Sequence, residues 1–185
     1  MPTGTDIGYG GEPVVVRRLT SPKDDALIAA RAAGLQVAEG RYTLRKYMHE
    51  VRPENLYEII ELAPNLFLTA GITEVLKLAA GLTATAYSAS NARLCVGSST
   101  AAVSAGQTAL TAELGRQLVD GAPSVVGNTI TFVATFLAAN ANGAWNEVGV
   151  SNAGSGGAMW SRTLATLGTK VSPAVWVLTW ALSIS

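Results

Sequence analysis

The sequence predicts a mainly β fold: an antiparallel β-sandwich or jelly-roll-like domain with one or two short helices and an extended N-terminal arm. In residues 129–136, apolar side chains alternate with threonines, and in residues 176–184 tryptophan, leucine and isoleucine recur at every second position. A period of two in β-branched and aromatic residues is typical of a strand with one buried face. Gly/Asn/Ser clusters at 140–143, 152–157 and 167–173 separate the predicted strands, as in antiparallel sandwiches.

Charge is distributed unevenly along the 185 residues. Charged residues make up 14% of the chain, below the roughly 25% of ordinary soluble domains. Residues 1–62 contain eight Lys/Arg and nine Asp/Glu, whereas residues 122–185 contain three charged residues. We therefore expect an arm with one short helix over residues 1–62 and a β-sandwich domain over 63–185. A surface this poor in charge favours association, so we expect a homo-oligomer.

Composition argues against several classes of function. The net charge is zero and there is no basic run, so direct nucleic-acid binding is not expected. The single cysteine, Cys95, provides no disulfide framework or zinc site, and we expect a buried structural thiol. The N-terminus lacks a charged segment followed by a hydrophobic one, so we expect no signal peptide. The apolar stretches at 66–82 and 171–184 are too short or interrupted for a membrane span.

The first predicted elements lie in the arm. Residues 1–12 are rich in Gly, Pro and Thr without periodicity; alone they should be disordered, and they would be ordered most easily by a neighbouring chain. Residues 14–16 favour a short strand. Ser21 is a candidate N-cap, followed by proline and two acids, and Gly34 is a plausible stop, so we expect a helix over residues 22–33.

The next segments are less distinct. The pattern does not decide the structure of residues 41–51, and residues 56–62 are compatible with a strand or a helical turn. Residues 70–80 have apolar side chains at helical spacing, with Thr69 as a candidate cap and Gly81 as a stop. We expect this helix to lay its apolar stripe against an open edge or end of the sheet.

Four further segments precede the C-terminal strands. Residues 93–97 predict a strand and residues 98–106 a loop of small residues. Residues 108–118 are interpreted as a second short helix or an irregular segment. Residues 123–127 are expected to begin the core.

No catalytic, cofactor or metal site is predicted. His49 is the only histidine and lies beside Glu50, where we expect an exposed or interface residue rather than a catalytic base. The hydroxyl run at 98–100 lacks the Gly-x-Ser-x-Gly pattern of a nucleophile elbow. The chain therefore offers no pattern typical of an enzyme.

One glutamate lies inside a predicted core strand. Glu147 follows Trp145 in a stretch otherwise poor in charge, and a buried carboxylate usually needs an arginine or several donors. Arg116 and Arg162 are the candidate partners, and we expect a structural charge pair between Glu147 and Arg162. The tryptophans could stack on a glycan, but the alternation around Trp176 and Trp180 favours a place in the core.

Several short segments, taken in their order along two-thirds of the chain, together carry a resemblance to a known family. They are Asn65–Leu76, Val96–Leu110, Gly127–Phe136, Ala144–Ala153, Met159–Arg162, Leu167–Lys170 and the C-terminal Trp/Leu strand. This ordered set resembles a family of small virion structural proteins of tailed bacteriophages, of the head decoration/cement or tail/collar type. The resemblance implies a non-enzymatic virion component assembled in the host cytoplasm.

Within that resemblance, the leading hypothesis is a capsid decoration or cement protein. A trimer would sit over capsomer junctions while the arm lies along neighbouring major capsid subunits, stabilising the shell by the area that it buries. Arg17, Arg18, Arg45 and Lys46 would contribute charge pairs at the rim of those contacts. The alternative is a tail, collar or fibre-anchoring subunit. A third possibility is a glycan-binding module or hydrolase on the virion, which requires Trp160 or Trp145 exposed beside Glu147.

Overall fold

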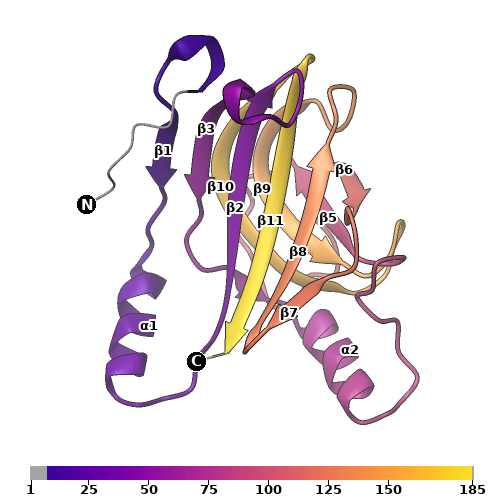
Figure 1. Ribbon diagram of the computed structural model, residues 1–185. Coiled ribbons are helices and arrows are strands. Elements are labelled where there is room, and N and C mark those ends of the chain that lie inside the picture. The colour runs from indigo at the N-terminus through magenta and orange to yellow at the C-terminus, as the bar shows by residue number, and fades with distance from the viewer. Residues whose placement is uncertain (1–7, 185) are drawn as a thin grey trace.

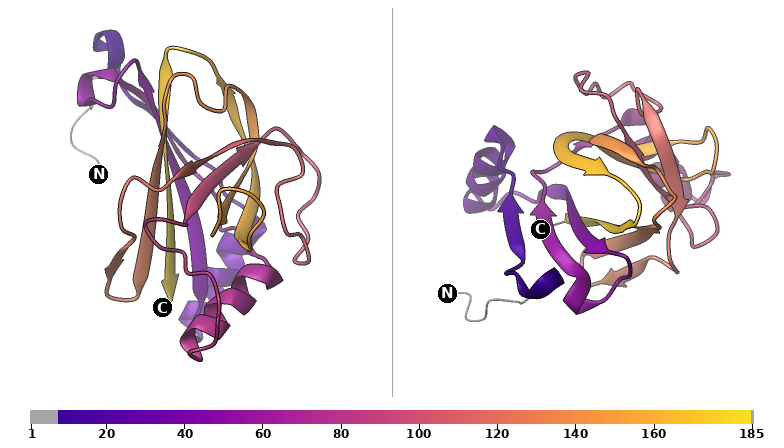
Figure 2. Two further views of the ribbon diagram at one scale, coloured as in Figure 1. Left: turned by 90° about the vertical axis from the view of Figure 1, so that its right-hand side faces the viewer. Right: turned by 90° about the horizontal axis from the view of Figure 1, so that it is seen from above.

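The computed structural model describes residues 8–184, apart from the side chains of Pro22 and Lys23, and is a mainly β sandwich of two facing sheets (Figures 1 and 2). Residues 1–12 were expected to be disordered alone and ordered by a neighbouring chain. Residues 1–7 of this segment lie outside the described residues. The six-stranded sheet has the order β1 (Val15–Arg18), β3 (Leu56–Glu61), β2 (Ala38–Met48), β11 (Ala174–Ile184), β8 (Thr129–Phe136), β7 (Ser124–Val126). The five-stranded sheet has the order β4 (Leu66–Phe67), β10 (Met159–Lys170), β9 (Gly143–Ser151), β5 (Arg93–Gly97), β6 (Glu113–Leu118).

The centre of the six-stranded sheet pairs the first long strand of the chain with the last. β2 and β11 run antiparallel in register from Ala174 opposite Met48 to Ile184 opposite Ala38. The domain boundary expected at residue 62 is therefore wrong, since residues 38–48 and 56–61 form two strands of the sandwich. The pattern was obscured because charged residues alternate with the buried ones and Lys46 interrupts the inward-facing apolar series.

Only residues 8–37 remain as an arm, and even these are attached to the sheet. The arm consists of a 3₁₀ turn, η1 (Tyr9–Gly11), the strand β1 and the helix α1 (Pro22–Ala32). β1 pairs with β3 in parallel, whereas every other strand pair described is antiparallel. All four residues of β1 are exposed, so the ladder to β3 is its main attachment.

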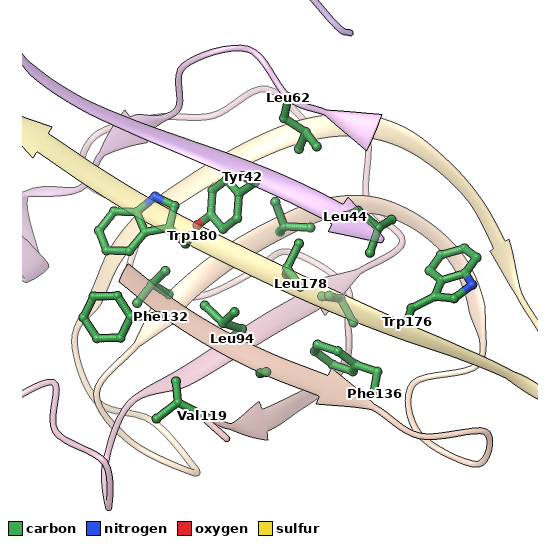
Figure 3. Close-up of a cluster of buried hydrophobic side chains, with 14 of the residues drawn as sticks. Tyr42, Leu44, Leu62, Leu94, Val119, Phe132, Phe136, Trp176, Leu178 and Trp180 are labelled. Atoms are coloured by element: carbon green, nitrogen blue, oxygen red, sulfur yellow. The ribbon is translucent and has the colours of Figure 1, made fainter. Parts of the chain in front are cut away.

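The core lies between the sheets and is rich in aromatic side chains (Figure 3). Phe132, Phe136, Trp176, Leu178 and Trp180 are buried, which confirms the inner faces predicted from the alternation in 129–136 and 176–184. Figure 3 shows them interleaved with Tyr42 and Leu44 of β2 and Leu94 of β5. Edge-to-face and tilted ring contacts of this kind add roughly 0.5–1.5 kcal/mol per pair to the free energy gained by burial.

The helix predicted over residues 22–33 is confirmed as α1. Its start is fixed by Asp24, whose carboxylate accepts a hydrogen bond of 2.7 Å from the backbone N–H of Ser21. Gly34 follows with φ of 74°, a left-handed conformation that glycine adopts without a steric penalty.

The second helix, α2 (Thr69–Ala79), confirms the helix predicted over residues 70–80. Thr69 is not its N-cap: that position belongs to Leu68, and no side chain caps the helix there. α2 packs on β10 at one end of the sandwich, as expected. The contact is close at Gly71, where a Cβ atom would overlap the Cα of Trp160.

Residues 108–118 form neither a helix nor an irregular segment throughout, because residues 113–118 are the edge strand β6. Leucines at 110, 114 and 118 have a spacing of four, which resembles a helical stripe. In the structure Leu110 packs in a small separate cluster before the strand begins, while Leu114 packs against the main core. The strand expected at 93–97 and the loop at 98–106 are confirmed, and residues 56–61 form β3 after the 3₁₀ turn η2 (Pro53–Asn55).

Neither α1 nor α2 is long and apolar enough to span a membrane, and the same holds for every helix in the described part of the chain.

The close approach at Gly71 leads to a first prediction. Gly71→Ala should lower the free energy of unfolding by about 1–3 kcal/mol, because the added methyl group forces α2 away from β10. Urea unfolding measures the change. Gly106→Ala is the matched control, since a Cβ atom there meets nothing within 4 Å. Equal stability of the two variants would contradict the predicted steric role of Gly71.

Candidate functional site

The most chemically distinctive group in the interior is the ion pair between Glu147 and Arg162. The two residues lie on adjacent strands, β9 and β10, and their side chains meet at 2.7 Å. Both side chains are 0% exposed. Of the two candidate partners, Arg162 contacts the carboxylate, while Arg116 pairs with Glu113 at 2.6 Å.

Both members of this pair also hold the long loop of residues 98–112. The Glu147 carboxylate accepts hydrogen bonds from the backbone N–H groups of Ala112 at 2.8 Å and Thr111 at 3.1 Å. Arg162 donates to the Ala101 carbonyl at 3.0 Å and to Gln107 Oε1 at 2.9 Å. A buried carboxylate already surrounded by donors and shielded from solvent is suited to fastening a loop rather than to general acid–base chemistry.

The tryptophans lie inside the sandwich. Trp145 packs edge-to-face on Trp176 at 4.8 Å between ring centroids, and Trp160 packs on Trp180 at 5.1 Å. The glycan-binding hypothesis required Trp145 or Trp160 to be exposed beside Glu147. All three residues are buried, so this site does not provide a stacking surface for a sugar.

The remaining candidate reactive groups are separated from one another. His49 is exposed, with its ring 6.3 Å from that of Tyr9 between centroids. Cys95 is buried in β5, as expected, and burial raises the pKa of its thiol to about 12. Across residues 8–184, no three His, Cys, Asp or Glu side chains gather as a metal site would require.

The four basic residues expected at the rim have different surroundings. Arg17 hydrogen-bonds to Glu58, and Arg18 pairs with Glu61 at 2.7 Å; both arginines join β1 to β3. Arg45 is half-buried on β2. These three retain enough exposure to contact a partner.

Lys46 does not belong with them, because its side chain is buried on the inner side of β2. Its ammonium group donates to the Glu58 carboxylate at 2.6 Å and to the carbonyl of Leu167, and it lies 4.3 Å from the ring centroid of Trp176. Burial lowers the pKa of Lys46, although Glu58 favours its charged form. Lys46 is therefore a core residue and cannot serve as a rim contact.

A second buried lysine was not expected from the sequence. Lys170, at the end of β10, donates to the carbonyl of Leu137 at 2.7 Å and to Asn142 Oδ1 at 3.2 Å. It thereby closes the turn that follows β8. The only signal in the sequence was that Lys170 is one of three charged residues in the C-terminal third.

An apolar hollow beside α2 was also missed. This α2 groove has a volume of about 250 Å³ and lies between the helix and the end of the two sheets. It is lined by Ala38, Phe67, Ile72, Val75, Leu76, Trp160 and Leu182. The apolar stripe of α2 was predicted from the sequence. The groove was not predicted, because it exists only where the ends of the sheets leave part of that stripe uncovered.

Comparisons with known protein families, with curated proteins and with solved structures found no match to this chain.

The buried ion pair leads to a second prediction. Arg162→Leu should lower the free energy of unfolding by about 3–5 kcal/mol, because it leaves the Glu147 carboxylate buried without its partner. The loop of residues 98–112 should become accessible to protease in the same variant. Arg52→Leu removes the exposed pair with Glu50 and should leave both measurements unchanged. An Arg162→Leu protein as stable as this control would refute the anchoring role.

A third prediction concerns Glu58, which links β1, β2 and β3. Burial alone would raise the pKa of its carboxyl group, but hydrogen bonds from Lys46 and Arg17 outweigh burial and hold the pKa below its usual value. A lowered carboxyl pKa gives stability that is present above the ordinary pKa and is lost as pH falls through the lowered one. Glu58→Gln should therefore flatten the loss of stability between neutral pH and about pH 3.

The measurement is the urea unfolding midpoint across that pH range. Glu54→Gln, a change at an exposed carboxylate in η2, should retain the wild-type profile. If the Glu58→Gln and wild-type profiles ran parallel, the Glu58 contacts would not stabilise the native state.

Proposed function

We propose that this chain is a non-enzymatic structural component of a tailed-bacteriophage virion, a capsid decoration or cement protein. One observation carries the proposal furthest: the interior ion pair and the single thiol are buried, while several aliphatic side chains are exposed on the surface. Glu147, Arg162 and Cys95 are inaccessible. Such a molecule is suited to making contacts rather than to transforming a ligand. The order of its sequence segments supports a virion as the setting.

The arm of residues 8–37 supports a role in bridging to a neighbour. α1 is attached to the sheet through ion pairs, Arg41 with Asp24 at 2.7 Å and Arg31 with Glu39 at 2.7 Å. A helix of this length is marginal in water on its own, and most helical stability comes from packing. Ile28 and Leu35 are exposed on or just after it, so a surface that covered them would stabilise the arm.

The arm and the sandwich would have different partners. The arm would lie on neighbouring major capsid subunits, and the sandwich would associate with copies of itself, as a trimer over capsomer junctions. Arg17, Arg18 and Arg45 would supply charge pairs at the rim, without Lys46. Burial of apolar area would supply most of the affinity, and the charges would supply register.

A fourth prediction tests the location. A cryo-EM map of the intact virion should contain this chain across the icosahedral shell, with the arm on major capsid subunits. Density confined to the neck or tail would contradict the proposal and indicate a collar or fibre-anchoring subunit instead.

Deleting residues 1–37 separates the arm from the sandwich in the same system. β2 keeps its full ladder with β11 in that variant, so the sandwich should still fold. We expect the truncated chain to be lost from the capsid, and we expect the shell to open at a lower temperature.

Reversing the charge of Arg45 alone, as Arg45→Glu, should weaken binding to the capsid more at low salt than at high salt.

A further inference from the structure

The inner face of the six-stranded sheet continues beyond the core at the end where α2 lies. Pairing places Val125 of β7, Ile130 of β8 and Leu182 of β11 in one row across the sheet, and Ile184 follows Leu182 on the same face. Val125 is 68% exposed and Ile184 is 51% exposed. The inner face that is buried along the rest of these strands is therefore exposed at this end of the sheet.

α2 covers this end only in part. The helix contacts β10 through Gly71, and the α2 groove remains open between it and the sheet ends, near Ala38 and Leu182. Along the rim of the groove, Ile72 is 42% exposed and Leu76 is 63% exposed. The patch thus combines a ridge, formed by Ile72 and Leu76, with a hollow directly beside it.

Charge is absent from the lining of the α2 groove. The two charged residues of α2, Glu74 and Lys77, pair with each other at 3.0 Å. Glu74 also accepts a hydrogen bond of 3.0 Å from the backbone N–H of Thr85, and both residues line a different hollow, between α2 and residues 152–158. A charged or strongly polar partner would lose its hydration at the groove without finding a counter-charge.

We propose that the α2 groove is the self-association surface of this protein, filled by Ile72 and Leu76 of a second copy. An uncharged apolar patch is complementary to another patch of the same kind, and this chain carries one. Because the ridge and the hollow lie side by side, each copy can insert its ridge into the hollow of the next copy. Repeated about a three-fold axis, this head-to-tail contact closes into a ring, as the proposed trimer requires.

This inference deepens the proposed function by naming the surface through which copies associate. It concerns the isolated chain and does not depend on where the chain lies in a virion. A failure of one proposal is therefore distinguishable from a failure of the other, since self-association is measured in solution and location is measured on the particle.

The test is sedimentation velocity and light scattering of the full chain over a range of concentrations, for wild type and Leu76→Glu. The wild type should be an oligomer. Leu76→Glu should weaken association by about 30-fold or more, as expected for a central contact residue that now buries a charge. Leu137→Glu is the control: Leu137 is 59% exposed and follows Phe136, which pairs with Trp176 at the opposite end of the ladder from Leu182.

Hydrogen exchange of residues 69–79 gives a second measurement on the wild type and the Leu76→Glu variant. In the wild type these amides should become more protected as concentration rises, and in Leu76→Glu the dependence should disappear. A wild-type chain that stays monomeric, or an oligomer unaffected by Leu76→Glu, would overturn the proposal. Protection of these amides only when other virion proteins are added would also overturn it and would identify a different occupant.

Discussion

The ladder between β2 and β11 is the interaction on which the rest of the structure depends. It places the first long strand of the chain beside the last, so that the middle of the six-stranded sheet is made of segments more than a hundred residues apart. β3 and then β1 attach to one side of this pair, and β8 and β7 attach to the other. Loop closure over such a separation must precede the gain from pairing, which is typical of slowly folding β topologies.

How far the sequence predicted this fold depended on what each strand faced. β8 and β11 were evident from the sequence because large apolar side chains occupy one face, while the other face carries threonine and other small or β-branched residues. β2 was hidden because its inner face includes Lys46, which is neutralised by Glu58 from a strand that the pattern could not assign. β6 was missed because leucines with a spacing of four belong to two different clusters. Tertiary contacts override local periodicity in both cases.

The candidate site was predictable in part for a similar reason. A glutamate in an apolar strand implies a partner, but two arginines were available, and only the pairing of β9 with β10 distinguishes Arg162 from Arg116. The loop that this ion pair holds has no recognisable pattern, since it is made largely of small residues. The α2 groove could not be predicted, because it results from how far two sheets and a helix extend past one another.

The arrangement of the tryptophans has a consequence for spectroscopy. In each close pair, one ring belongs to β11 in the six-stranded sheet, and the other belongs to β9 or β10 in the five-stranded sheet. Indole rings held edge-to-face across the two layers form a rigid, asymmetric chromophore. Near-ultraviolet circular dichroism from these pairs would therefore measure contact between the two sheets and would be insensitive to rearrangements of the arm. Loss of that signal with the far-ultraviolet spectrum retained would identify a state in which the sheets have separated before their strands come apart.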